Sequence, residues 1–346
     1  MRRLDFIESQ RAALTEAVAR FARPGEAYAL VGFPDHANVG DSAIWLGARA
    51  VLARLTGRAP AHVAGNGRAG LIGLRARLGA GTIYILGGGN FGDLWIGSQR
   101  LRERLLAAFP DNRIVQLPQS IHFEFESAAE RCAEAIGRHG DFHLMVRDDA
   151  SAVSALDRFD CPVVLAPDCA FGLGPLTLAG PPRHALLALL RDDKERARGH
   201  DAPLEALRPR IEDWLAEPWR PIARAKLALL AGELRAGRFG GGAARLAHYD
   251  LMARRRLRRG LATLASGSQA VTDRLHGHIL CLLLGIPHVA LDNSYGKLSA
   301  YHRTWSHGVE GAAFAPDAGA AVTALAALPR RHAADPALPT PARRAA

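Results

Sequence analysis

The sequence has few aromatic residues and almost no lysine. Aromatics make up 6% of the 346 residues, and the lysines are limited to Lys194, Lys226 and Lys297, so arginine carries nearly all of the positive charge. The formal net charge of +10 favours anionic partners such as phosphorylated substrates, lipid head groups or nucleic acid. Nucleic acid ranks last, because the chain has no aromatic-interleaved basic motif and no recognised nucleic-acid-binding module.

Cysteine is scarce as well, and long apolar runs are missing. The four cysteines stand singly without a CxxC pair or a zinc pattern, which predicts buried free thiols in a reducing compartment. Residues 1–20 lack the apolar core of a signal peptide, and the longest apolar run, Ile279–Leu291, is too short for a bilayer. We therefore expect a cytoplasmic protein, with peripheral contact to the inner face of the plasma membrane left open. The cysteines are Cys132, Cys161, Cys169 and Cys281.

Three common catalytic signatures are absent from the sequence. The fourteen histidines include no HExxH pair, so no metal site is expected. A Ser-His-Asp hydrolase fits poorly because there is no GxSxG elbow. The glycine-rich segment Gly87–Asp93 lacks both the GK[ST] of a Walker loop and the third glycine of a dinucleotide fingerprint.

Short apolar segments alternate with helical patterns at the spacing of βαβ units. After a leading helix at Leu4–Phe21, this alternation predicts a parallel sheet covered by helices on both faces. A chain of 346 residues also exceeds the usual size of one hydrophobic core, so an α/β protein with two lobes is expected. The strands expected in the first lobe are Tyr28–Gly32, Thr82–Leu86, Arg113–Gln116, Phe142–Val146 and Pro162–Leu165.

A Gly- and Pro-rich stretch, Gly172–Pro182, is typical of a linker between lobes. It divides residues 1–174 from residues 175–330, and residues 331–346 are expected to be a disordered tail. In the second lobe we expect mostly helix over Glu205–Ala265 and a loop from Leu291 to Trp305, so this lobe is abbreviated and short of strands. Its expected elements are His184–Leu190 (strand or short helix), strand Gln269–Thr272, helix Gly277–Leu284 and strand His288–Leu291.

Ligands of parallel α/β sheets collect beyond the carboxyl ends of the strands. The segment Asn38–Ser42 follows the first strand, and its free N–H groups favour a phosphate or a carboxylate. The alternative is an ordinary helix cap made by Asp41 or Ser42. In Gly87–Asp93, four glycines allow the backbone to approach a ligand closely, although a purely structural turn remains open.

Three further strand ends carry polar residues. Gln116–His122 follows a strand and can orient a substrate or form a polar loop. Arg147, next to a helix start, can present a planar fork to an anion or pair with Asp148 or Asp149 at the surface. Asp168 is a weaker candidate of the same kind.

The segment Thr272–His278 joins a strand to an apolar helix. Arg274 and His276 are two residues apart, so they point to the same side of an extended segment. This places an anion-binding guanidinium beside an imidazole that can act as a general acid near neutral pH. Elsewhere, the arginine run Arg254–Arg259 is expected to be a solvated face, with a patch for anionic lipid as the alternative.

Taken together, NVGD, GGGNFGD, LPQSIHF, VRDDAS, APDCAF and TDRLHGHILCLLLGIPHVALDNSYGK resemble the polysaccharide pyruvyl transferase family. The resemblance spans roughly Val31 to Trp305, with the GGGN and RLHG elements in the family's order. It implies a GT-B-like fold of two Rossmann-like lobes. It also implies transfer of pyruvate from phosphoenolpyruvate to a sugar as a ketal, on a lipid-linked precursor of an exopolysaccharide or other surface polysaccharide.

The resemblance implies roles for individual residues. Arg147 and Arg274 bind the carboxylate and phosphate of phosphoenolpyruvate, and His276 is the general acid. An acid and two guanidiniums meet the chemistry of this donor without a metal or another cofactor. The expected partners are phosphoenolpyruvate and a lipid-linked oligosaccharide acceptor. The candidate binding residues are Asn38, Gly40, Asp41, Gly88, Gly89, Asn90, Gln119, Ser120 and Asp273.

Two other functions remain open from the sequence. A GT-B glycosyltransferase would use a nucleotide sugar, but no clear acidic residue for ribose recognition is present. A non-catalytic scaffold of a polysaccharide assembly complex would tolerate replacement of Arg147, Arg274 and His276. Converging positions of these three side chains are what the transferase hypothesis requires.

Overall fold

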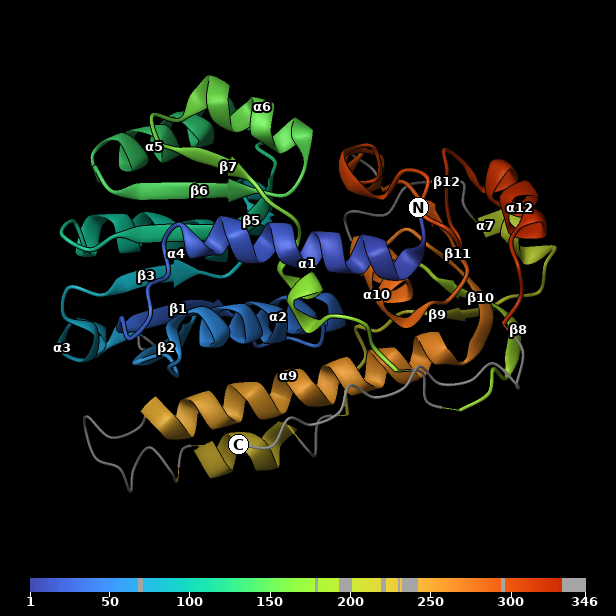
Figure 1. Cartoon of the computed structure of the whole chain (residues 1–346), viewed down its shortest axis with the longest axis horizontal. Helices are drawn as coiled ribbons and strands as arrows, with labels where there is room; N and C mark the ends of the chain where they lie inside the picture. The colour runs from blue at the N-terminus through green and yellow to red at the C-terminus, as the bar shows by residue number, and fades with distance from the viewer. Residues whose placement is uncertain are drawn as a thin grey trace. The chain divides into compact units, whose positions relative to one another are not determined.

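The computed structural model describes residues 1–67, 71–177, 180–192, 201–218, 222–229, 231, 242–293 and 296–331. The chain forms two compact units (Figure 1). The β1 unit, named after its first strand β1 (Tyr28–Phe33), comprises Gln10–Gly172 and Ala216–Arg256. The β8 unit, named after β8 (His184–Leu189), comprises Met1–Ser9, Leu173–Leu215 and the chain from Leu257 onward. Of the tail expected at residues 331–346, Arg331 is described and is buried, and residues 332–346 lie outside the described residues.

The β1 unit contains a parallel sheet in the order β2-β1-β3-β5-β6-β7, with β4 paired to β5. Figure 1 shows these strands side by side, with helices along them. Besides β1, the strands are β2 (His62–Gly65), β3 (Thr82–Ile85), β4 (Gly88–Phe91), β5 (Ile114–Ile121), β6 (Phe142–Val146) and β7 (Val163–Leu165). Its helices include α2 (Val39–Thr56), α3 (Leu74–Leu78), α4 (Ile96–Ala108), α5 (Glu126–Gly137) and α6 (Asp149–Arg158). It also contains the part of α1 (Arg3–Ala19) from Gln10 and the part of α9 (Gly242–Ala265) up to Arg256, and the remaining residues of these two helices belong to the β8 unit.

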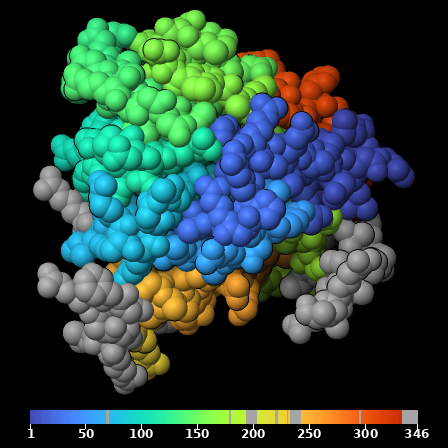
Figure 2. All heavy atoms as spheres, turned by 60° about the vertical axis from the view of Figure 1, so that its left-hand side comes forward, coloured from blue at the N-terminus to red at the C-terminus, as the bar shows by residue number. Residues whose placement is uncertain are grey.

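Alternate residues of the strands pack into two separate hydrophobic cores, one on each face of the sheet. Along β1, Tyr28 and Leu30 face a core that includes residues of α1, α2 and α9. Ala29 and Val31 face the other core, which includes residues of α3, α4, α5 and α6. Side chains alternate across a strand, so the sheet is covered on both faces, as the continuous apolar strands predict. Green atoms of the region of α5 and α6 form part of the surface in Figure 2. Val153 and Leu156 of α6 are exposed.

The helix after β1 is capped by a residue other than the two that the sequence suggests. The side chain of Asn38 accepts a hydrogen bond from the Gly40 N–H at 3.0 Å, and α2 begins at Val39. The expected caps Asp41 and Ser42 therefore lie within the first turn. An acidic residue in that turn complements the helix dipole, and one carboxylate oxygen of Asp41 also lies 3.5 Å from the His36 ring.

The two glycines Gly47 and Gly172 let α2 pack against the backbone of the 3-10 turn Cys169–Leu173. A Cβ on Gly47 would lie 1.9 Å from the carbonyl oxygen of Cys169, and one on Gly172 would lie 2.4 Å from the carbonyl oxygen of Gly47. Real Cβ atoms do not approach backbone so closely, so any side chain at Gly47 forces the helix and the turn apart.

Replacing Gly47 by alanine is therefore expected to lower the free energy of unfolding by about 3 kcal/mol. Gly97 in α4 is a matched control, because it is exposed and a Cβ there would meet no atom within 4 Å. Gly97→Ala is expected to raise the free energy of unfolding by ~0.5 kcal/mol. Urea titration of both variants measures the difference, and equal midpoints would contradict the close packing of α2.

The β8 unit contains a five-stranded parallel sheet in the order β12-β11-β10-β8-β9. The expectation of a lobe short of strands is wrong, because β9 lies inside the stretch expected to be helical and β12 was not expected. The loop expected up to Trp305 is also wrong, since it contains α11 and a π-helical turn. The elements are α7 (Asp201–Glu205), β9 (Arg210–Glu212), β10 (Gly267–Thr272), α10 (Leu275–Leu284), β11 (His288–Leu291), α11 (Lys297–Tyr301), the π-helical turn (His302–Ser306), β12 (Ala312–Ala315) and α12 (Ala318–Ala327).

The N-terminal residues of the chain support α10. This helix ends at Gly285, which has a φ of 75°. Arg3 donates to the carbonyl oxygens of Leu282 at 2.9 Å and Leu283 at 3.2 Å. A guanidinium at the last turn satisfies terminal carbonyls and complements the helix dipole. Burial lowers the pKa of Arg3 from its ordinary value.

The two sheets have the same strand order. In the β1 unit, β1 lies between β2 and β3, and β5, β6 and β7 follow outward from β3. In the β8 unit, β8 lies between β9 and β10, and β11 and β12 follow outward from β10. The direction of winding therefore changes between β1 and β3 in one sheet and between β8 and β10 in the other. In open parallel sheets, the crevice at such a switch point is the usual place for a ligand.

The arginine run on α9 is only partly solvated. Arg254, Arg255 and Arg258 are exposed, as expected. The expectation is wrong for Arg256, whose buried side chain lies 3.1 Å from a carboxylate oxygen of Glu217. Among the described residues, no helix combines the length and the apolarity that crossing a bilayer requires.

Candidate functional site

The switch point of the β1 unit brings together residues that follow β1 and β3. Asn38 donates from its side-chain nitrogen to a carboxylate oxygen of Asp41 at 2.9 Å. Gly88 has a φ of +135°, and a Cβ on it would lie 3.7 Å from the other carboxylate oxygen of Asp41. Gly88 therefore lies beside the Asp41 carboxylate in a backbone conformation that favours glycine, at the point where the winding of the sheet changes.

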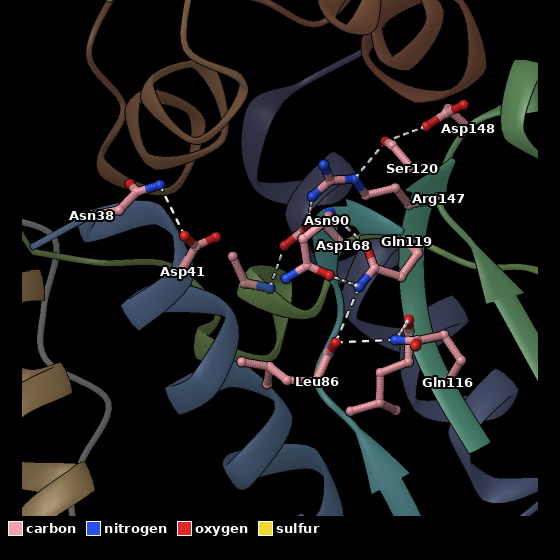
Figure 3. Close-up of polar contacts among 12 residues, drawn as sticks. Asn38, Asp41, Leu86, Asn90, Gln116, Gln119, Ser120, Arg147, Asp148 and Asp168 are labelled. Carbon is pink, nitrogen blue, oxygen red and sulfur yellow. Dashed lines mark hydrogen bonds and ion pairs between the residues drawn. The ribbon is translucent and has the colours of Figure 1, made fainter. Parts of the chain in front are cut away.

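Gln119 connects the glycine-rich segment to β5. Its side-chain nitrogen donates to the Leu86 carbonyl oxygen at 3.1 Å and to the Asn90 side-chain oxygen at 2.8 Å, and its oxygen accepts from the Asn90 N–H at 3.2 Å (Figure 3). The expectation that Gln119 and Ser120 lie past the end of a strand is wrong, because β5 continues to Ile121. The pairing of β5 with β6 shifts register between Gln116 and Gln119.

Arg147 lies at the end of β6 with its side chain fully buried. One guanidinium nitrogen forms an ion pair with Asp168 at 2.6 Å, and the Nε donates to the Ser120 hydroxyl at 2.9 Å (Figure 3). Ser120 in turn donates to Asp148 at 2.6 Å. The alternative of a surface pair with Asp148 or Asp149 is therefore wrong, since Asp148 caps α6 by accepting from the Ser151 N–H.

Arg102 is a buried residue of this unit that the sequence did not indicate. Its guanidinium donates to the side-chain oxygens of Gln116 at 2.9 Å and Gln99 at 2.5 Å, and it lies 3.8 Å from the ring centroid of Phe91. Burial lowers the pKa of Arg102 to about 10. Because Phe91 belongs to the glycine-rich segment, Arg102 anchors that segment from the side of α4. An arginine in a helical pattern gave no signal of this role.

The corresponding edge of the β8 unit carries Arg274 and His276. Arg274 is the N-cap residue of α10, and its guanidinium nitrogen lies 2.7 Å and 2.8 Å from the two carboxylate oxygens of Asp213. The expected extended segment ends here, because α10 begins at Leu275 and His276 lies in its first turn. Within Thr272–Leu280, His276 is the one residue that is not buried, so its imidazole is accessible at this edge.

Asp273 is buried beside these residues. One of its carboxylate oxygens accepts the Arg191 N–H at 2.9 Å. Burial raises the pKa of Asp273 to about 6, against the opposing effects of that hydrogen bond and of the charges of Arg274 and Arg191. The sequence did not indicate Arg191 or Asp213. Asp213 follows a three-residue strand that has no apolar run.

A chain of hydrogen bonds connects buried histidines of α10 and β11 to the π-helical turn. The Nδ1 of His288 lies 2.8 Å from the Ile286 carbonyl oxygen, which can only accept, so this nitrogen carries the proton. The Nε2 of His288 then accepts from the Nδ1 of His278 at 2.7 Å, and the Nε2 of His278 accepts from the Ser306 hydroxyl at 2.9 Å. His302 lies 3.2 Å from the same hydroxyl. Both buried rings are therefore held in the neutral form.

This chain predicts a loss of stability in mild acid. Burial lowers the pKa of His288 to about 4, and that of His278 falls well below its ordinary value. Groups with a lowered pKa in the folded state stabilise it above the unfolded pKa, near 6.5 for histidine, and lose that contribution as pH falls. The free energy of unfolding is expected to fall between pH 6.5 and pH 4, measured by urea titration.

Replacing His288 by asparagine is expected to make this fall shallower, because one buried proton acceptor is removed. The control is His184→Asn, since His184 begins β8 and takes no part in this hydrogen-bond chain, and its loss is expected to leave the slope unchanged. An identical slope in the wild type and in His288→Asn would contradict the prediction.

Each unit therefore gathers its candidates at one edge. The β1 unit brings Asn38, Gly40, Asp41, Gly88, Gly89, Asn90, Gln119, Ser120 and Arg147 to the carboxyl ends of β1, β3, β5 and β6. The β8 unit brings Asp273, Arg274 and His276 to the carboxyl end of β10. Parallel sheets with guanidinium, carboxylate and imidazole groups at their carboxyl edges are typical of α/β enzymes.

Comparison with known sequences is more specific. Residues 38–295 match the family described as Polysaccharide pyruvyl transferase, and the chain belongs to that family. It is 32% identical to "Pyruvyl transferase 1" of Schizosaccharomyces pombe over 81% of this chain and 70% of that protein. It is also 32% identical to "Putative pyruvyl transferase EpsO" of Bacillus subtilis over 66% of this chain and 70% of that protein.

A solved structure has a similar fold. An uncharacterized protein of Klebsiella pneumoniae matches with a TM-score of 0.56 and 16% sequence identity, over 89% of this chain and 98% of that one. At this level of identity the match supports the α/β fold alone. The enzyme class, a polysaccharide pyruvyl transferase, is given by the sequence family.

Proposed function

We propose that the protein transfers pyruvate from phosphoenolpyruvate to a sugar residue of a lipid-linked precursor of an exopolysaccharide or other surface polysaccharide, forming a cyclic ketal. The observation that carries this proposal is the position of His276 and Arg274 at the carboxyl end of β10. An accessible imidazole follows a guanidinium there at the start of an apolar helix. Membership of the pyruvyl transferase family supports the reaction type.

Phosphoenolpyruvate reacts at two carbons. His276 donates a proton to the methylene carbon, and C2 acquires oxocarbenium character. One sugar hydroxyl attacks C2, and a second hydroxyl then displaces phosphate to close the ketal. One hydroxyl proton restores His276, and the other leaves with the phosphate or passes to water. Histidine is a common general acid in enzymes, so the His276 imidazole suits the first step. The Arg274 guanidinium suits the acidic groups of the donor and the phosphate that leaves.

The β1 unit supplies the remaining polar groups in this proposal. Asp41, Asn90 and the backbone of Gly88 and Gly89 contact donor or acceptor. The Arg147 guanidinium is fully buried against Asp168, so we propose that it contributes its positive charge to donor binding while it orders Ser120 and Asp168. Two units of the same strand order fit a GT-B-like enzyme with two Rossmann-like lobes, the arrangement that we propose.

The test is phosphate release from phosphoenolpyruvate by the purified full chain with candidate glycolipid acceptors, followed by mass spectrometry of the acceptor. The expected result is release that depends on both substrates and an acceptor that gains one pyruvyl ketal. Acceptor-dependent activity with a nucleotide sugar instead, and none with phosphoenolpyruvate, would remove the assignment. We also propose that the enzyme acts at the inner face of the plasma membrane. Activity on an acceptor embedded in lipid vesicles tests this location.

A further inference from the structure

The switch point of the β8 unit lies between β8 and β10. Two residues past the end of β8 the chain reaches Arg191, and directly past β10 it reaches Asp273 and Arg274. The crevice beyond the carboxyl ends of such a strand pair is where open α/β sheets bind ligands. Arg191 therefore occupies the same kind of position as Arg274, on the neighbouring strand.

Hydrogen bonds fix these two strand ends to each other. The Thr272 hydroxyl donates to the Leu189 carbonyl oxygen at 2.8 Å, and the Arg191 N–H donates to Asp273 at 2.9 Å. Both Arg191 and Asp273 are buried, with 8% and 1% of their surface exposed. The backbone that carries Arg191 is thus held directly beside the backbone that carries Arg274.

The charges of both arginines reach the same carboxylate. The Arg191 and Arg274 guanidiniums each oppose the rise in the pKa of Asp273 that burial causes. Arg274 already shares its guanidinium with the carboxylate of Asp213. A donor such as phosphoenolpyruvate has two acidic groups, a carboxylate and a phosphate. One guanidinium that is already paired with Asp213 cannot form bidentate hydrogen bonds with both of them.

We propose that Arg191 is a further donor-binding residue, whose guanidinium binds one acidic group of the phosphorylated donor beside Arg274. This inference rests on the proposed function for the identity of the donor. The anion site itself depends only on the geometry of the β8 unit. It takes a small acid phosphate and requires the planar fork of an arginine.

The test compares the binding of inorganic phosphate and of phosphoenolpyruvate to the full chain by titration calorimetry. Arg191→Gln is expected to weaken both by about 10- to 100-fold, the range for loss of a charge-assisted hydrogen bond. The matched control is Arg183→Gln, because Arg183 is exposed and precedes the amino end of the same strand. The control is expected to bind both probes as the wild type does.

Arg191→Lys distinguishes a binding role from a structural one. The substitution keeps the charge and the backbone N–H to Asp273, so the fold is retained, while the planar fork is lost. Weaker binding of both probes by the folded lysine variant supports the proposal, also where Arg191→Gln fails to fold. Wild-type affinity in either folded variant overturns it.

The same titrations separate the two proposals. If the wild type binds phosphate through Arg191 but releases none from phosphoenolpyruvate with the acceptors tested, the anion site is supported and the proposed function is wrong. If the wild type turns over phosphoenolpyruvate while Arg191→Gln shows unchanged affinity for both probes, the proposed function is supported and the binding role of Arg191 is wrong. A wild type that binds neither probe overturns both.

Discussion

Replacing His276 by glutamine is expected to lower kcat for phosphate release from phosphoenolpyruvate by about 10²- to 10⁴-fold, the contribution of a well-placed general acid. Glutamine retains a hydrogen-bonding side chain of similar length but cannot protonate the methylene carbon. The Michaelis constant for the donor is expected to change little, because Arg274 remains. Steady-state kinetics with saturating acceptor measure both constants.

The control for His276→Gln is His184→Gln. His184 begins β8 and so lies at the opposite, amino-terminal end of the same sheet. Its replacement is expected to leave kcat within about 2-fold of the wild type, because active sites of parallel sheets lie at the carboxyl ends. Wild-type kcat in His276→Gln would show that the proton comes from another group.

Replacing Arg147 by methionine is expected to lower the free energy of unfolding by about 3–5 kcal/mol, the cost of removing one partner of a buried ion pair. Methionine fills much of the same volume but leaves the carboxylate of Asp168 without its cation. That carboxylate is fully buried, and its other oxygen accepts the Ala170 N–H at 2.8 Å. Urea denaturation followed by circular dichroism measures the change.

An exposed ion pair of the same unit provides the comparison. Arg138 lies 3.0 Å from Glu134 in an i,i+4 pair, and both side chains are largely in solvent. Arg138→Met is expected to change the free energy of unfolding by less than about 0.5 kcal/mol. Similar losses in the two variants would mean that the enclosure of Arg147 contributes nothing particular to stability.

Five strands of the β1 unit could be predicted from the sequence because they are apolar runs, whereas β2 and β4 were not expected. Phe142–Val146 was predicted with its exact bounds, and Tyr28–Gly32 ends one residue early. The length of β5 could not be predicted, because Pro118 and Gln119 interrupt its apolar pattern. The structure accommodates them by a register shift, which depends on the neighbouring strand rather than on local sequence.

Some polar residues of the β8 unit could be predicted and others could not, depending on whether an apolar strand precedes them. Arg274 and His276 follow a clear apolar strand, so their position at a ligand edge could be inferred. β9 has three residues, Arg210–Glu212, in which two are charged and the strand forms only by pairing with β8. Asp213 therefore had no local signal, and its pairing with Arg274 is a property of the folded chain.

The dependence of α10 on Arg3 has a practical consequence for dissecting this protein. A fragment that starts after residue 174 retains every strand of the five-stranded sheet. It lacks the guanidinium that satisfies the carbonyls of Leu282 and Leu283. The helix that presents His276 would then fray from its far end. Expression of this half alone calls for grafting residues 1–9 back in place, because sequence position and structural membership do not coincide here.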